Sequence, residues 1–409
     1  MQSHSYGRGR FSHSHALRVA LTSAQCFNPI TGEPWSEAML LGLGGGLSAG
    51  SLLWHFRTHN ASVLTLGFHH RWNEPEAWYR NVLERVGAEG SWRQATGRRR
   101  ADRALESALR RGHTAVCWVD EHHLPYLHVN EAFDGCFTWV TTATELSGDQ
   151  VTLAEVWGQS MTVQLPQFQA ARRRIADHRN RLLEISGPQS AQPLKQSLVE
   201  AIADHVNHLT ATSSSVGLGA LRAWARAMAD RSGRKGWARQ FQGGAGLASV
   251  FRSMYEGIVG RGMDGAGLRR LYADFLREAS GLLDAPTLAD VAVVYDDCAA
   301  RWTDLALTPL LGGEAGTLPY LEALRGRFDA LSEGTMEDIE AASAALNKLN
   351  AEFDTTPPWT PPQQRALLDS LSERAQALWL LERRAASTLR RWLNSVERDD
   401  GYAFAASKL

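Results

Sequence analysis

The sequence is poor in cysteine and has no long apolar run. Its four cysteines, Cys26, Cys117, Cys136 and Cys298, lie far apart and form no CxxC pair, which argues against a zinc knuckle or a disulfide framework. A bilayer-spanning helix needs about 18 consecutive apolar residues, and because none occur we expect no membrane contact. The N-terminus also lacks the apolar core of a signal peptide. We therefore expect a cytoplasmic protein.

An excess of charge of one sign is also absent. The formal net charge is −1, which gives no reason to expect a nucleic acid or a membrane surface as partner. Arginine far outnumbers lysine, and mutational bias in a GC-rich genome explains this at least as well as function does. The histidine pairs at 69–70 and 122–123 lack the HxxxH or HExxH spacing of zinc sites. We assign no metal and expect no cofactor.

What the chain does contain suits a globular protein of two domains. Its 409 residues, 44% of them hydrophobic, are too many for one ordinary core. The 14 tryptophans are a high number. We expect most of them in the core, because an indole buries a large area, and some could line an aromatic pocket.

The first part of the chain alternates between helix and strand signals. Ser36 is placed to cap a helix that runs through Leu41 and ends at the glycines that follow. A capping box that starts at Asn73 predicts a helix up to Val86, and residues 101–111 form another helix. Predicted strands, two of them a hairpin across 147–150, cover residues 63–68, 114–119, 137–142, 151–157 and 161–163.

Strand signals nearly vanish from residue 166 onward. Helical periodicity takes over, and the best linker is the segment 186–193. We therefore predict an α+β fold class, with an α/β domain over 1–185 and an all-helical domain over 194–409. The predicted helices cover residues 166–185, 194–209, 216–230, 245–259, 266–282, 286–307, 316–332, 335–352 and 361–396.

Short matches in both halves of the chain resemble one family. In this order they are similar to the N-terminal domain of butirosin biosynthesis protein H, a papain-like thiol fold, and to the helical domain of unknown function that commonly follows it. The matches in the first half are Ala16-Leu17-Arg18, Ser36-Glu37-Ala38, the glycine segment 42–46, Val119-Asp120 and Leu124-Pro125-Tyr126. Those in the second half are Gly217-Leu218, Trp224, Gly262, Gly265, Arg269 to Glu278, and Trp302.

The resemblance implies a mostly antiparallel papain-like domain and acyltransferase chemistry. The type member moves an amino-acyl group from a carrier-protein thioester to an amine of an aminoglycoside. Such transfer needs a nucleophile, a base that activates it and an orienting carboxylate. In this chain Ser12 stands where the family has its cysteine, and Cys136 stands where it has its histidine. Glu155 matches the acid, and His128 could act as a displaced base from a loop.

Three of these catalytic predictions have a plainer interpretation, and a further cysteine offers an alternative nucleophile. Ser12, or Ser14 two residues later, would cap the first helix by accepting from free N–H groups. Cys26 could be a displaced thiol nucleophile or a buried structural cysteine. The loop histidines, His128 and the pair at 122–123, would be solvated surface groups. Glu155 would be a strand-edge carboxylate in water.

Five residues are predicted to bind substrate. Gly44, Gly45 and Gly46 permit close backbone approach and could supply oxyanion N–H groups or hold a phosphate, although they could also be only a helix stop. Trp118 and Tyr126 could line the pocket, where tryptophans would stabilise a developing cation.

Two arginine groups could face partners. Arg98 to Arg100 and Arg103 form a basic face that could dock an acidic acyl carrier protein, or could simply be solvated. Arg269 and Arg270 begin a helix, where the helix dipole disfavours cations. They indicate an anionic partner or a carboxylate at a domain interface.

We therefore predict an enzyme of specialised-metabolite biosynthesis that catalyses acyl transfer, or an amide- or ring-forming step, on a carrier-bound or amine-bearing intermediate. One alternative is a non-covalent cyclase acting on a reactive polyketide or imine intermediate. The other is a non-catalytic binding protein on the same fold. The partners would be a small-molecule or acyl-carrier-bound substrate and a second copy of the chain in a homodimer.

Overall fold

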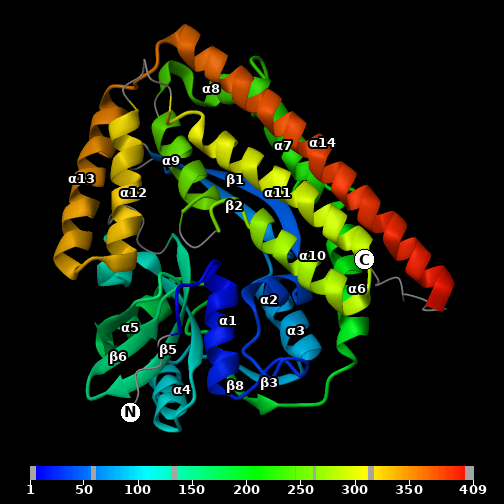
Figure 1. Cartoon of the computed structure of the whole chain (residues 1–409). Helices are drawn as coiled ribbons and strands as arrows, with labels where there is room; N and C mark the ends of the chain where they lie inside the picture. The colour runs from blue at the N-terminus through cyan, green and yellow to red at the C-terminus, as the bar shows by residue number, and fades with distance from the viewer. Residues whose placement is uncertain are drawn as a thin grey trace. The chain divides into compact units, whose positions relative to one another are not determined.

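The structure is a computed structural model (Figure 1), and it describes residues 6–56, 61–129, 136–244, 246–260, 264–311 and 317–400. It is α+β, with an antiparallel sheet in the N-terminal part and many helices after it, as the sequence predicts. The chain forms two compact units. The first unit combines Met1–Leu40, Leu83–Ala191 and Glu322–Lys348, and the second combines Leu41–Val82, Gln192–Leu321 and Leu349–Leu409. Each unit joins segments that are separate in the sequence. The contiguous domains expected over 1–185 and 194–409 remain a prediction.

The first unit is built on a six-stranded antiparallel sheet. Its strand order is β3-β8-β4-β5-β6-β7, so β3 and β7 are the edge strands. The predicted hairpin is confirmed: Ser147 pairs with Gln150 and Thr142 pairs with Ala154. The strands are β3 (Ala88–Arg93), β4 (Ala115–Asp120), β5 (Thr138–Ser147), β6 (Gln150–Ala154), β7 (Ser160–Gln164) and β8 (Leu182–Pro188).

Helices pack on this sheet from distant parts of the chain. In α1 (Ser12–Ser23), the Ala16 carbonyl accepts a hydrogen bond of 3.1 Å from Thr142 Oγ1 of β5. The segment Glu322–Lys348 of the same unit belongs to α12 (Leu318–Glu333) and α13 (Met336–Thr355). Leu331 and Ile339 of these helices are buried in the core cluster of the sheet. The remaining helices of this part of the chain are α2 (Glu37–Leu43), α4 (Arg98–Arg110) and α5 (Leu165–Arg174).

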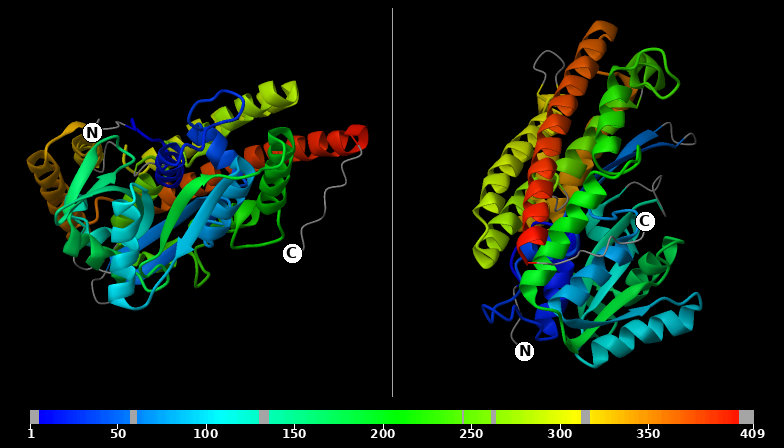
Figure 2. Two further views of the ribbon diagram at one scale, coloured as in Figure 1. Left: turned by 90° about the horizontal axis from the view of Figure 1, so that it is seen from below. Right: turned by 90° about the vertical axis from the view of Figure 1, so that its right-hand side faces the viewer.

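The second unit contains an antiparallel two-stranded ribbon and most of the long helices. The ribbon pairs β1 (Leu47–Phe56) with β2 (Ala61–His69). The 40-residue helix α14 (Pro361–Asp400) runs beside α7 and α11, as Figure 2 shows. We find no helix in the described residues with the length and apolar content to cross a membrane. The other helices are α3 (Pro75–Val86), α6 (Leu194–Leu209), α7 (Gly217–Ala229), α8 (Trp237–Gln240), α9 (Leu247–Ile258), α10 (Arg269–Leu283) and α11 (Pro286–Leu307).

Local sequence rules predict many of these boundaries. Ser36 caps α2, since its Oγ accepts from the Met39 N–H at 3.0 Å. The prediction of one helix over 166–185 is wrong, because α5 ends at Arg174 and the chain enters β8, which also takes up the first residues of the expected linker. Strand β1 was not predicted. Its exposed residues Leu52 and Trp54 are apolar, so the apolar-in, polar-out alternation of a half-buried strand is missing.

Candidate active site

Ser12 is the first residue of α1. Phe11 precedes it as the N-cap residue in extended conformation, and no side chain caps the helix from that position. Ser12 is buried, with 8% of its surface exposed, and its hydroxyl has no hydrogen-bond partner among the residues that the structure describes. The capping role expected for Ser12 or Ser14 is not observed, because Ser14 Oγ instead donates to the Phe11 carbonyl at 3.1 Å.

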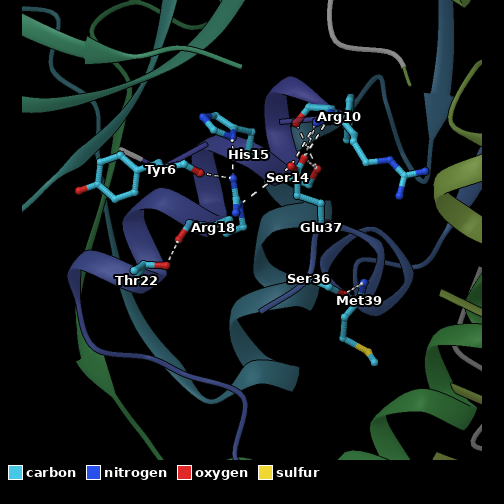
Figure 3. Close-up of polar contacts among 10 residues, drawn as sticks. Tyr6, Arg10, Ser14, His15, Arg18, Thr22, Ser36, Glu37 and Met39 are labelled. Carbon is cyan, nitrogen blue, oxygen red and sulfur yellow. Dashed lines mark hydrogen bonds and ion pairs between the residues drawn. The ribbon is translucent and has the colours of Figure 1, made fainter. Parts of the chain in front are cut away.

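The Glu37 carboxylate fixes the chain in front of α1 (Figure 3). It accepts the backbone N–H groups of Arg10 and Phe11, each at 3.1 Å at its nearest oxygen, and the Ser14 hydroxyl at 2.8 Å. Arg18 lies 3.9 Å away as a weak ion-pair partner. Burial raises the pKa of Glu37, and these hydrogen bonds act in the opposite direction. Glu37 therefore does what a capping side chain would do, from another helix.

His15, which follows Ser14 in α1, is a poor base. His15 is buried, and its Nδ1 lies 3.4 Å from the Arg18 guanidinium. Burial, followed by the charge of Arg18, lowers the pKa of His15 to about 3. The imidazole is therefore neutral at physiological pH, and it has little tendency to accept a proton from a serine.

Glu155 lies just after β6 and is 1% exposed. One carboxylate oxygen accepts the Tyr126 hydroxyl at 2.6 Å, and the other accepts the indole N–H of Trp139 at 2.8 Å. Burial raises the pKa of Glu155 to about 7, although both hydrogen bonds act to lower it. The interpretation of Glu155 as a solvated strand-edge carboxylate is therefore wrong. It is a buried group that can change its protonation near neutral pH.

Aromatic rings surround this carboxylate. The indoles of Trp139 and Trp157 are stacked, with centroids 5.2 Å apart and an interplanar angle of 8°. Tyr126 meets Trp157 edge to face at 6.4 Å. We call Tyr126, Trp139, Glu155 and Trp157 the aromatic carboxylate cluster.

The segment in front of α1 reaches this cluster. The Gly9 N–H donates to the Val156 carbonyl at 2.7 Å, next to Glu155. Gly158 has a φ of +91°, and a Cβ there would lie 3.0 Å from the Arg8 backbone nitrogen. Only glycine allows this close approach, which brings the start of α1 toward the loop that carries Glu155.

The structure brings together only some of the predicted site residues of the first unit. Tyr126 and Glu155 are in direct contact, whereas the strand residue hydrogen-bonded to Glu155 is Trp139 and not Cys136, which is exposed just before β5. His128 has a left-handed φ of 45°. Burial lowers the pKa of its imidazole, while the charge of Glu340 acts to raise this pKa and that of Arg327 acts to lower it. Trp118 is buried in β4, with its ring 5.4 Å from that of Trp92.

Cys26, the other candidate thiol, is unsuited to nucleophilic attack. Cys26 is buried, and its Sγ lies 3.6 Å from the Ala24 carbonyl. Burial raises the pKa of Cys26, so the reactive thiolate is disfavoured. This agrees with the structural interpretation of that residue.

The predicted glycine site lies in the second unit and is filled by the protein itself. Gly44, Gly45 and Gly46 are all buried in the turn between α2 and β1. The N–H of Gly45 donates to Gly42 at 2.8 Å and that of Gly46 to Leu41 at 3.1 Å, so both are used within the turn. The φ angles of Gly45 and Gly46 are +106° and +70°.

Side chains crowd these three glycines. A Cβ would lie 2.0 Å from Trp78 at Gly44, 2.7 Å from His70 at Gly45 and 2.6 Å from Tyr272 at Gly46. The glycines therefore permit close packing in this structure. The family match at Gly262 lies outside the described residues.

Arg269 in the second unit has a carboxylate partner. Its guanidinium makes a bidentate pair with Glu382 of α14, at 2.8 and 3.0 Å, and both side chains are fully buried. Its remaining donors bind the carbonyls of Gly267 at 2.8 Å and Ser48 at 3.0 Å. The indole of Trp302 also donates to Glu382, at 2.7 Å. The arginine at the start of α10 thus serves an internal ion pair.

Comparison with known families matches both halves of the chain. Residues 21–154 match the family described as butirosin biosynthesis protein H, N-terminal, and residues 164–334 match a domain of unknown function, DUF4872. This chain carries the butirosin biosynthesis protein H N-terminal domain followed by DUF4872. No curated protein matches the sequence.

The matched ranges divide the candidate site. The butirosin biosynthesis protein H N-terminal domain contains Tyr126, Cys136 and Trp139, and it ends directly before Glu155. Ser12 and the Glu37-clamped segment at 10–11 precede its first matched residue. Helices α13 and α14 both follow the end of the DUF4872 match, yet they supply Ile339 and Glu382 to the two cores.

Trp139 was expected only as one of several tryptophans that could line a pocket and stabilise a cation, together with Trp35, Trp54, Trp118 and Trp157. Its hydrogen bond to Glu155 was not predicted, because no sequence signal links the two residues. Glu155 lies directly after the last residue of β6, so the pairing of the hairpin does not extend to it. The course of the chain beyond the strand decides that its carboxylate meets Trp139.

The hydrogen bond between Trp139 and Glu155 limits the chemistry in which this carboxylate can take part. In a nucleophile–His–carboxylate arrangement, the carboxylate accepts the N–H of an imidazole whose other nitrogen takes the proton. An indole is a donor only and cannot act as this base. Across the described ranges, no group of three or more His, Cys, Asp or Glu side chains is arranged to hold a metal ion.

Proposed function

We propose that this protein is an enzyme of specialised-metabolite biosynthesis. In our proposal it catalyses an amide- or ring-forming step on an amine-bearing or carrier-bound intermediate, without forming an acyl-enzyme. The match to a family named for butirosin biosynthesis supports the pathway class. The hydrogen bond from Trp139 to Glu155 supports the non-covalent route, because it puts a group without basic character against the orienting carboxylate.

Glu155 would accept and return the proton of the reaction, and its carboxylate would stabilise positive charge on the intermediate. With a pKa of about 7, it can take a proton from an ammonium or iminium group and return it at neutral pH. Its 2.6 Å contact with Tyr126 offers a path for that proton through the phenol. The rings of Trp139 and Trp157 would stabilise a developing cation by cation–π attraction.

A second candidate function is acyl transfer through Ser12. It is favoured by the position of Ser12 at the N-terminus of a 12-residue helix, where the helix dipole stabilises a developing anion. It also requires a base, and among the described residues none is hydrogen-bonded to the Ser12 hydroxyl. For this reason we rank it below the non-covalent route.

Complementation of a deletion strain tests the proposal in the producing cell, where the native substrate is present. We expect wild type and Ser12→Ala to restore the missing metabolite, detected by mass spectrometry, and Glu155→Gln to fail while remaining folded. Cys136→Ser is the matched control, since Cys136 is exposed and is not a partner of Glu155. If deletion leaves the metabolite profile unchanged, the enzymatic role is refuted.

Intact-protein mass spectrometry with a thioester donor separates the two routes. We expect no adduct on Ser12 in the wild type. An acyl group on Ser12, together with failure of Ser12→Ala to complement, would establish acyl transfer instead. Analytical ultracentrifugation of the same protein tests the proposed homodimer.

A further inference from the structure

A cavity of about 780 Å³ in the first unit is rich in arginine. It lies along α4 and β3, both marked in Figure 1, and is separate from the aromatic carboxylate cluster in its lining residues. Its volume is typical of a site for a small molecule. Five arginines line it: Arg93, Arg100, Arg103, Arg110 and Arg111. We call this cavity the arginine groove.

The nearby carboxylates neutralise only part of this charge. Glu184 pairs with Arg111 at 2.6 Å and with Arg93 at 3.4 Å, and Glu106 lies 3.6 Å from Arg110. Arg100 and Arg103 have no carboxylate partner among the described residues, and Arg103 Nε donates only to the Arg99 carbonyl. Two guanidinium groups therefore face the groove with most of their donors unused.

Helix α4 carries most of these arginines in an arrangement that is unfavourable for the helix itself. Residues 100, 103, 107 and 111 lie on one face of a helix because they are three or four positions apart. The first turn of α4 contains three arginines and no acidic residue, although a helix N-terminus disfavours positive charge. A ligand with negative charge would relieve both the mutual repulsion and the unfavourable dipole.

The rest of the wall supplies polar and aromatic contacts. Asn180 is 2% exposed, and its Nδ2 donates to the Ala95 carbonyl at 2.8 Å. Its Oδ1 is buried with no partner in the described structure. Trp92 contributes a partly exposed indole that is backed by Trp118 at 5.4 Å. The arginines and the Trp92 ring therefore suit a ligand that combines anionic groups with a planar ring.

We propose that the arginine groove binds a phosphate-bearing small molecule of the nucleotide class. The forked donors of Arg100 and Arg103 match phosphate oxygens, and the Trp92 ring offers a stacking surface for a base. The proposal is independent of the chemistry assigned to Glu155. A free nucleotide and the nucleotide part of coenzyme A share this chemistry.

Isothermal titration calorimetry of the full chain tests this proposal with ADP, coenzyme A, pyrophosphate and adenosine. We expect ADP to bind more tightly than pyrophosphate or adenosine, and its affinity to fall with added salt. Loss of charge-assisted hydrogen bonds should weaken ADP binding by about tenfold or more in the double variant Arg100→Gln/Arg103→Gln. Tighter binding of coenzyme A than of ADP would identify coenzyme A as the source of the nucleotide.

Arg98→Gln/Arg99→Gln is the charge-matched control, because neither residue lines the groove although both lie on the same helix turn. We expect it to change the ADP affinity less than twofold, a general charge effect only. Equal losses in both double variants, or no measurable heat with ADP and coenzyme A, would overturn the proposal. So would binding of an apo acyl carrier protein that is abolished by Arg100→Gln/Arg103→Gln while ADP does not bind.

Discussion

Trp139 donates its indole N–H to Glu155 at 2.8 Å, and this contact defines the buried end of the candidate site. A papain-like arrangement would need an imidazole at this point, able to pass a proton to and from the nucleophile. The indole holds the carboxylate in place but transfers no proton. Glu155 is therefore hydrogen-bonded to an indole at the position where such an arrangement would need an imidazole.

Trp139→Phe should destabilise the protein because it leaves one oxygen of a buried carboxylate without a donor. We expect a loss of about 1–3 kcal/mol in the free energy of unfolding beyond the cost of the smaller ring, measured by urea denaturation. Trp157→Phe is the matched control, since the Trp157 indole nitrogen is buried without a partner in the described structure. Equal losses in the two variants would show that the hydrogen bond contributes nothing.

The raised pKa of Glu155 predicts a pH-dependent stability. Its value is about 7 in the folded protein against an ordinary 4.5, so between these pH values only the folded state binds the proton. The contribution of Glu155 is therefore fully present below pH 4.5 and is lost as the pH rises through 7. The expected change is about 3 kcal/mol between these limits.

Unfolding of Glu155→Gln in urea at pH 5 and at pH 8 measures this effect. Because glutamine does not titrate, the variant should gain stability relative to wild type as the pH rises. A stability difference that is the same at both pH values would contradict a raised pKa for this carboxyl group.

Glu37→Ala should free the segment in front of α1. The N–H groups of Arg10 and Phe11 would lose their acceptor, and the Ser14 hydroxyl would keep only the Phe11 carbonyl. We expect faster hydrogen exchange of residues 10–14 and a loss of about 2–4 kcal/mol in unfolding free energy, since buried groups without partners are costly. The exposed Glu33 provides a control as Glu33→Ala. Unchanged exchange in this segment would refute the clamp.

Glu382→Gln should strongly destabilise the second unit. It leaves the buried Arg269 guanidinium without a compensating charge, which typically costs about 3–5 kcal/mol. Chemical denaturation of this variant can be compared with Glu373→Gln, which changes an exposed residue on the same helix. A loss below that of the control would mean that the ion pair contributes no net stability.

Local rules predicted much of the secondary structure because the signals are local. The Ser36 cap, the helical periodicity after residue 194 and the β5–β6 hairpin all depend on residues a few positions apart, and they are confirmed. The prediction of helix over 182–185 failed because β8 exists only by pairing with β3 and β4, which lie far away in sequence. Strand pairing of this kind leaves only a weak local pattern.

The sequence predicted some residues of the candidate site, but not how they contact one another. Glu155 and Tyr126 were expected at the site, and they are 2.6 Å apart. Trp139 could not be recognised as the partner of Glu155, because Glu155 lies just after β6, where no strand pairing fixes its position. The roles of Ser12, Cys136 and His128 remain predictions.

Short motifs and periodicity predicted the two domain types in their order, the α+β class and most helices. Only the folded structure shows which groups are buried and what they touch. It gave Glu155 a raised pKa through desolvation, filled the space beside Gly44 to Gly46 with side chains and paired Arg269 with Glu382 across 113 positions. Burial and long-range contact depend on how the whole chain packs, and no local pattern encodes them.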